Sequence, residues 1–96
     1  MITSEQKTFN ELIGRLYDII HGENYTTVVL HVGKSNPRIV ALAAKNEAFE
    51  QMCKQNPINI NQVVKVKFYI SSREANNRYY TNAHILEICE LPSLQV

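Results

Sequence analysis

The sequence predicts an all-β barrel of five strands with one short helix between the third and fourth strands. Three observations lead to this fold class: a period-two alternation in the C-terminal half, a polar turn that follows it, and an earlier pair of β-rich segments. The chain has 96 residues and a mass of 11.0 kDa. This length holds one small domain, which we expect to span residues 1–96.

The fourth strand has the clearest pattern, because apolar and polar residues alternate over residues 64–71. The side chains that we expect to face the core are Val64, Val66, Phe68 and Ile70. Those that we expect to face solvent are Lys65, Lys67, Tyr69 and Ser71. A polar turn at residues 75–78 then leads into a fifth strand from Tyr79 to Leu91. These two strands form a hairpin.

The middle of the chain predicts a second hairpin followed by the helix. Tyr25–Val32 is rich in β-branched residues, Gly33–Pro37 supplies a turn, and Arg38–Ala43 forms the next strand. We expect Asn46 to cap a short helix that ends at the Asn56-Pro57 pair. Its apolar face, which we expect to pack on the core, contains Ala48, Phe49, Met52 and Cys53.

The N-terminal segment is ambiguous on periodicity alone. Its apolar residues fit helical spacing: Phe9, Leu12, Ile13, Leu16, Ile19 and Ile20. Ser4 would cap such a helix, whereas Gly14 interrupts it. The elements that follow favour a strand here, because a sheet of four strands would have open edges and a fifth strand would close it.

The predicted order of elements is that of the OB-fold, a five-stranded barrel with a helix after its third strand. Residues 9–32 resemble the opening hairpin of bacterial single-stranded DNA-binding proteins. The closing segments, Val64–Glu74 and Asn77–Asn82, resemble a family of small uncharacterised OB-fold proteins of bacteria and phages, in which the hairpin reads F-x-I-x-S-R-E … G-R-Y-F-T. The chain departs from these patterns in having Asn77 where glycine is usual and in lacking tryptophan. It also lacks the acidic, glycine-rich tail with which replication-type members recruit partners.

Composition excludes several classes of protein. Ten Lys and Arg residues against nine Asp and Glu give a net charge of +1, which excludes a strongly basic or acidic protein but leaves room for a local patch. The N-terminus has no apolar signal region, and no apolar run approaches the ~20 residues of a membrane span. Cys53 and Cys89 do not form a disulfide framework, so we expect reduced thiols, a cytoplasmic location and no membrane association.

No motif in the sequence supports catalysis. His21, His31 and His84 are scattered, with no carboxylate or thiol at metal-ligand spacing. There is no phosphate-binding glycine loop and no nucleophile motif. We therefore expect neither an enzyme, nor a metal site, nor a small-molecule cofactor.

Basic and aromatic residues instead favour a nucleic-acid interface on and around the closing hairpin. Cations that follow phosphates, interleaved with rings that stack on bases, are what binding of a single strand requires. The candidate residues are Lys34, Arg38, Lys65, Lys67, Tyr69, Arg73, Arg78, Tyr79 and Tyr80. One of the two adjacent tyrosines should point inward, since neighbours on a strand alternate. We expect the acidic residues to lie elsewhere, on the helix and late in the last strand.

Two functions follow from this interpretation. The first is non-catalytic binding of single-stranded DNA, or of RNA, with little sequence preference. The alternative is an OB-fold protein-interaction module, such as a phage or accessory protein that docks on a replication or host factor, because fold alone does not separate the two. We also expect a homo-oligomer, since single barrels gain affinity by joining, and we expect the apolar tail from Leu91 to Val96 to pack on the barrel or on a neighbour.

Overall fold

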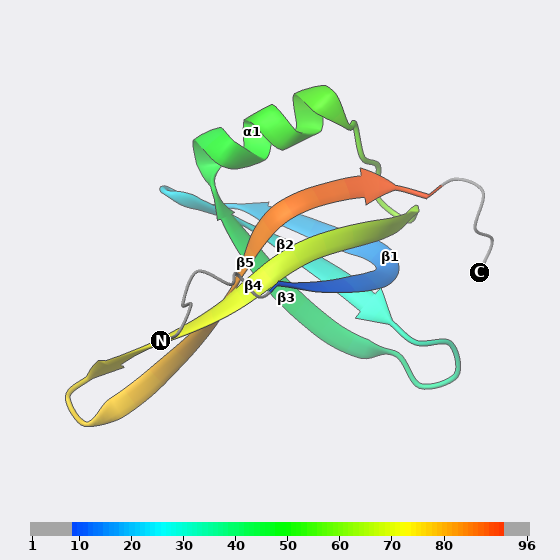
Figure 1. Cartoon of the computed structure of the whole chain (residues 1–96). Coiled ribbons are helices and arrows are strands. Elements are labelled where there is room, and N and C mark those ends of the chain that lie inside the picture. Colours follow the sequence, from blue (N-terminus) through cyan, green and yellow to red (C-terminus); the bar gives the residue numbers. More distant parts are fainter. Residues whose placement is uncertain (1–8, 92–96) are drawn as a thin grey trace, which may run out of the picture.

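The N-terminal segment forms a strand, and it completes a closed five-stranded barrel (Figure 1). The computed structural model describes residues 9–91, so Ser4 and most of the apolar tail lie outside the described residues. The elements are β1 (Asn10–His21), β2 (Tyr25–Val32), β3 (Arg38–Lys45), α1 (Asn46–Gln55), β4 (Val63–Ala75) and β5 (Arg78–Glu90). The order around the barrel is β1-β2-β3-β5-β4. Both the fold class and the strand assignment of residues 10–21 are confirmed.

Strand β1 pairs with two neighbours, which explains why its apolar spacing departs from simple alternation. Its first half is antiparallel to β4, and its second half is antiparallel to β2. Gly14 and Arg15 lie where the strand passes from one partner to the other. A Cβ atom on Gly14 would lie 2.9 Å from the carbonyl oxygen of His31, so only glycine allows this close approach. A bulge follows between Leu16 and Asp18.

The core lies inside the barrel and under α1, which covers one end of it (Figure 1). Its fully buried side chains come from all five strands: Leu16, Thr26, Val28, Leu30, Leu42, Val64, Val66 and Ile88. Phe49 is the buried side chain of the helix, with Met52 and Cys53 packed against the core. Ala48 is exposed, so its predicted place in the core is wrong. Within residues 9–91, no helix is long and apolar enough to cross a membrane.

Asn46 does not cap the helix as predicted, because it is already the first helical residue and Lys45 occupies the cap position. Its amide instead connects the start of α1 to the β1–β2 loop. Asn46 Nδ2 donates to the carbonyls of Gly22 and Glu23, at 3.1 Å each, and Asn46 Oδ1 accepts from Thr26 Oγ1 at 2.7 Å. The buried hydroxyl of Thr26 thereby has a partner.

The β4–β5 hairpin extends well beyond the barrel (Figure 1). Asn76 and Asn77, with φ of 53° and 64°, make its two-residue turn in the left-handed region, where asparagine is tolerated in place of glycine. Because the outer part of the hairpin has no core beneath it, Ile70 is 55% exposed, and its predicted inward orientation is wrong. Tyr79 and Tyr80 are both exposed for the same reason, so the prediction that one of them points inward is also wrong.

We expect Gly14→Ala to destabilise the barrel. The added methyl group would meet the His31 carbonyl oxygen and Val32 Cγ2, each at 2.9 Å, and both atoms belong to paired strand. Overpacking of this kind costs about 1–3 kcal/mol, so the Tm measured by circular dichroism should fall by several degrees. Glu11→Ala, at an exposed position of the same strand, is the control and should change the free energy of unfolding by less than about 0.5 kcal/mol. An unchanged Tm for Gly14→Ala would contradict this account of the strand crossing.

Candidate nucleic-acid interface

The outer face of the β4–β5 hairpin carries a row of aromatic, polar and basic side chains. Residues directly opposite in an antiparallel pair share a face. The pairs on this face are Tyr69 with His84, Ser71 with Asn82, Arg73 with Tyr80, and Ala75 with Arg78. The row continues the outward positions of β4, and it begins just beyond a bulge between Lys67 and Phe68.

Side chains in this row hold one another in place. The Tyr69 and His84 rings are stacked, with centroids 4.8 Å apart and planes inclined by 21°. Nε2 of His84 lies 2.9 Å from Ser71 Oγ, within hydrogen-bonding distance. The Arg73 guanidinium carbon lies 5.7 Å from the centre of the Tyr80 ring, close enough for a cation–π contact. One stacked pair and one cation–aromatic pair therefore lie on the same face of the hairpin.

This row faces a hollow where β3 and β5 meet. The two strands pair in parallel at Ala43 and His84, and the small Ala43 side chain leaves the surface open there. Tyr25, at the first position of β2, lies beside this junction. Two clefts share Tyr25, Ala43 and His84, and together we call them the Tyr25 cleft. One, of about 420 Å³, is lined by Tyr25, Ala43, Ser71, Ser72, Arg73, Asn82 and His84. The other, of about 280 Å³, is lined by Tyr25, Ala43, Ala44, Lys45, Ala48, Tyr69, His84, Ile85 and Leu86.

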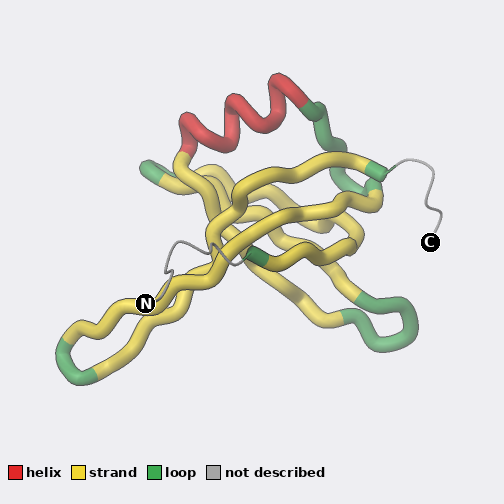
Figure 2. The backbone as a smooth tube through the Cα atoms, viewed as in Figure 1, coloured by secondary structure: helices red, strands yellow, loops and turns green. Residues whose placement is uncertain are grey.

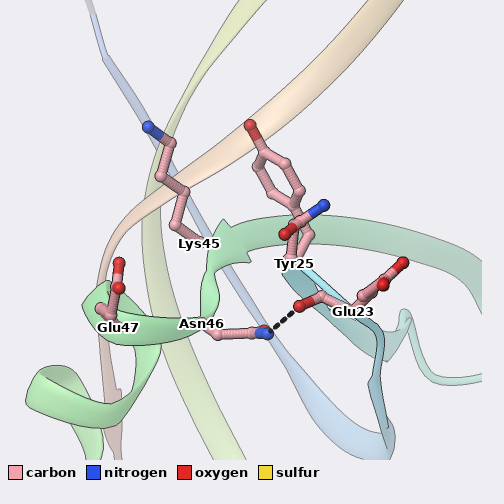
Figure 3. Close-up of a pocket in the computed structure, with 6 residues that line it drawn as sticks. Glu23, Tyr25, Lys45, Asn46 and Glu47 are labelled. Atoms are coloured by element: carbon pink, nitrogen blue, oxygen red, sulfur yellow. Dashed lines mark hydrogen bonds between the residues drawn. The ribbon is translucent and has the colours of Figure 1, made fainter.

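A third hollow adjoins the Tyr25 cleft at the start of the helix. Tyr25 and Lys45 are opposite residues of β2 and β3, and their side chains point the same way from the sheet (Figure 3). Glu23 and Glu47 line the hollow with them. The Asn46 side chain bonds the Glu23 carbonyl and so keeps the β1–β2 loop beside it (Figure 3). Lys45 therefore lies between an acidic hollow and the Tyr25 cleft, and it lines both.

Four of the predicted residues gather at the outer face of the hairpin. Tyr69 and Arg73 line the Tyr25 cleft, and Tyr80 packs beside Arg73. Arg78 lies further out on the same face, opposite Ala75. Tyr79 lies on the reverse face, opposite Glu74.

Lys65 and Lys67 lie on the outer face of β4 but line neither part of the Tyr25 cleft. Lys67 Nζ is 3.5 Å from a carboxylate oxygen of Glu87 and 4.8 Å from the centre of the Phe9 ring. Glu11 of β1 pairs with Lys67 on its other side. The expected separation of acidic from basic residues is therefore wrong at this point, because the strand register places two glutamates beside one lysine.

Lys34 and Arg38 lie at the β2–β3 loop. Figure 2 shows this loop and the tip of the β4–β5 hairpin projecting on opposite sides of the molecule. The structure thus divides the predicted residues between widely separated parts of the surface. Neither part of the Tyr25 cleft is lined by Lys34 or Arg38.

Sequence reasoning did not identify Tyr25, Lys45 or His84 as site residues. A signal existed for His84, because it lies four residues after Tyr80 on a strand and therefore shares its face. Tyr25 and Lys45 carried no such signal. Their position depends on how β3 meets β5, which no local pattern reports.

Two solved structures are similar to this fold. One is the crystal structure of Rim1, a mitochondrial single-stranded DNA-binding protein from S. cerevisiae, with a TM-score of 0.67, 12% identity, and coverage of 88% of this chain and 96% of that one. The other is the N-terminal domain of PriB from Thermoanaerobacter tencongensis, described as dimeric, with a TM-score of 0.59, 16% identity, and coverage of 88% and 97%. Identities this low show the OB-fold alone. No protein-family model and no curated protein sequence matches the chain.

Proposed function

We propose that this chain binds single-stranded DNA in the Tyr25 cleft, without catalysis and with little sequence preference. One observation carries the proposal: rings from three separate strands, Tyr25 of β2, Tyr69 of β4 and His84 of β5, line the Tyr25 cleft. Arg73 lines the part of the cleft that contains Tyr25 and His84. Aromatic rings stack on any base, because every base has a π-face, and this makes the binding tolerant of sequence.

The charged groups at the cleft suit a phosphate backbone. Arg73 lines one part of the cleft and Lys45 lines the other, so a strand that crosses both parts would meet a cation in each. Arg73 already packs on Tyr80, which reduces the rotamer freedom that it would lose on binding. Exposed bases are required for stacking, so a single strand fits this cleft better than a duplex does.

The position of the cleft also supports the proposal. OB-folds bind oligonucleotides on the face of strands 2 and 3 and between the loops that join strands 1 to 2 and 4 to 5. The Tyr25 cleft lies between the start of β2 and the β4–β5 hairpin. Rim1, whose fold is similar, is named as a single-stranded DNA-binding protein. The free thiols Cys53 and Cys89 fit a cytoplasmic location, where thiols stay reduced.

Removal of one cation from the cleft should reduce the salt dependence of binding. We expect Arg73→Gln to make the log–log slope of affinity against salt less steep by about 0.7, the value for one phosphate contact on a single strand. Fluorescence anisotropy with a labelled single-stranded oligonucleotide across a salt series measures this slope. A duplex of the same sequence should bind more weakly. The affinity for an RNA of the same sequence, compared with that for the DNA, shows whether the chain prefers DNA.

The matched control is Lys54→Gln in the last turn of α1, which should leave the slope unchanged because this lysine lies outside the cleft. Equal slopes for the wild type and both variants would contradict a phosphate contact at Arg73.

Removal of a stacking ring should weaken binding without changing the salt slope. We expect Tyr25→Ala to raise the Kd by about 5- to 150-fold, which corresponds to the ~1–3 kcal/mol of one base stack. The slope should not change, because stacking releases few ions. Tyr79→Ala is the matched control: this tyrosine is 74% exposed on the reverse face of the hairpin, and its loss should leave the Kd unchanged. If both variants bind like the wild type, the cleft is not the binding site.

We further propose that the chain forms a homo-oligomer. Isoleucines are exposed on β1 and β3: Ile13 by 46%, Ile20 by 53% and Ile39 by 72%. Exposed apolar side chains of this kind also favour the second candidate function, a protein-interaction module. A similar fold, the PriB domain, is described as dimeric.

Light scattering at micromolar concentration should therefore give a mass of at least two chains of 11.0 kDa each. A mass of one chain at every concentration would contradict self-association. If the chain then also fails to bind single strands, protein docking becomes the better explanation of the exposed isoleucines.

A further inference from the structure

A second aromatic platform lies on the outer surface, away from the Tyr25 cleft. Tyr17 stacks on His31 with ring centroids 4.1 Å apart and planes inclined by only 15°. Tyr17 nevertheless remains 54% exposed, so the outer side of the stack is open to solvent. Neither residue lines the Tyr25 cleft.

A bulge in β1 produces this stack. Arg15 pairs with His31 and Asp18 pairs with Val29, but the pairing shifts between Leu16 and Asp18, so Tyr17 is the extra residue. Bulges redirect side chains, and they are frequent at barrel rims and beside functional sites. Because Tyr17 has no partner in the ladder, its ring lies over the imidazole of the neighbouring strand.

One basic side chain, Arg15, lies beside this platform. Arg15 is directly opposite His31 in the sheet. Its Nη1 donates to the carbonyl of Asn61 at 2.9 Å, which anchors the guanidinium at the barrel surface. The residue that pairs with His31 on β3 is the exposed Ile39, whereas Arg38 is opposite Val32 and belongs to the other face of the strand. The adjacent carboxylate of Asp18 accepts a hydrogen bond from the Ile19 backbone N–H at 2.9 Å and is thus engaged locally.

A continuous path joins the platform to the cleft. Tyr25 and His31 are the first and seventh residues of β2, and they share the outer face with Thr27 and Val29. At ~3.3 Å per residue, this path is about 20 Å long. The facing positions of β3 between the two ends are Ala43 and Ala41, whose short side chains leave the surface unobstructed. At the ~3.4 Å rise of a stacked strand, 20 Å is roughly six nucleotides, and an extended strand needs fewer.

We infer that the Tyr17–His31 platform is a second base-stacking site for the same single strand. This inference rests on the proposed function. A strand that enters the Tyr25 cleft runs along the outer faces of β2 and β3 and stacks its distant base on Tyr17, while Arg15 lies beside its phosphates.

The test is a length series of oligothymidylates from three to fifteen nucleotides, with the Kd measured by anisotropy or calorimetry. For the wild type, we expect a step in affinity at about six nucleotides, where the strand first reaches both sites. Tyr17→Ala should bind the shortest oligonucleotides like the wild type and lose about 5- to 150-fold for the longest, because only those reach the platform. Tyr17→Phe keeps the ring and should keep the step. If Tyr17→Ala does not fold, Tyr17→Thr, which suits a strand, replaces it.

Each outcome separates this inference from the proposed function. If Tyr17→Ala keeps the step, the platform does not bind the strand, while the cleft still does. If Tyr17→Ala changes the mass measured by light scattering but not the Kd at any length, this face is a contact between copies of the chain, and the inference is wrong. If the wild type binds no oligonucleotide of any length, the proposed function fails, and the platform inference fails with it.

Discussion

The barrel closes on a short parallel contact between β3 and β5, and this contact determines where the cleft lies. The other neighbouring strands of the barrel pair in antiparallel ladders of six residue pairs or more, whereas β3 and β5 pair only at Ala43 and His84. Parallel pairing cannot follow from a hairpin turn, so the chain crosses the end of the barrel through α1 before β4 and β5 return. The two strands diverge on either side of the contact, and the small Ala43 side chain leaves the space that Tyr25, Tyr69 and His84 line.

A difference in strand length supplies the rest of the site. Strands β2 and β3 have 8 residues each, and β4 and β5 have 13 each. The excess length has no core to cover, so both faces of the outer hairpin are in solvent. One face carries Arg73 and Tyr80, and the other carries Ile70 and Tyr79. The exposed rings of Tyr80 and Tyr79 therefore lie on opposite faces of a projecting ribbon, and only the face of Tyr80 continues into the Tyr25 cleft.

Local patterns in the sequence predicted the elements well and the site only in part. Alternation correctly identified Val64 and Val66 as core residues, because their strand lies over the barrel interior. The same alternation was wrong for Ile70, since the period of a strand does not report where the core beneath it ends. Tyr69 and Arg73 were found because they lie on one strand, whereas Tyr25 joins them only through the pairing of β3 with β5. The Lys67–Glu87 ion pair depends on register across a bulge, which the sequence does not report.

Binding of a single strand over the β3–β5 closure, as proposed, would change the surroundings of the backbone at the Tyr25 cleft. The most direct measurement is a titration of the ¹⁵N-labelled protein with an oligothymidylate, followed by two-dimensional NMR. We expect the largest shifts at the backbone amides of Tyr25, Ala43, Tyr69, Arg73 and His84, because these residues line the Tyr25 cleft. Amides of α1 beyond its first turn and of the reverse face of the hairpin, around Tyr79, should stay in place. Shifts confined to those two regions, or no shift at saturating oligonucleotide, would contradict the account.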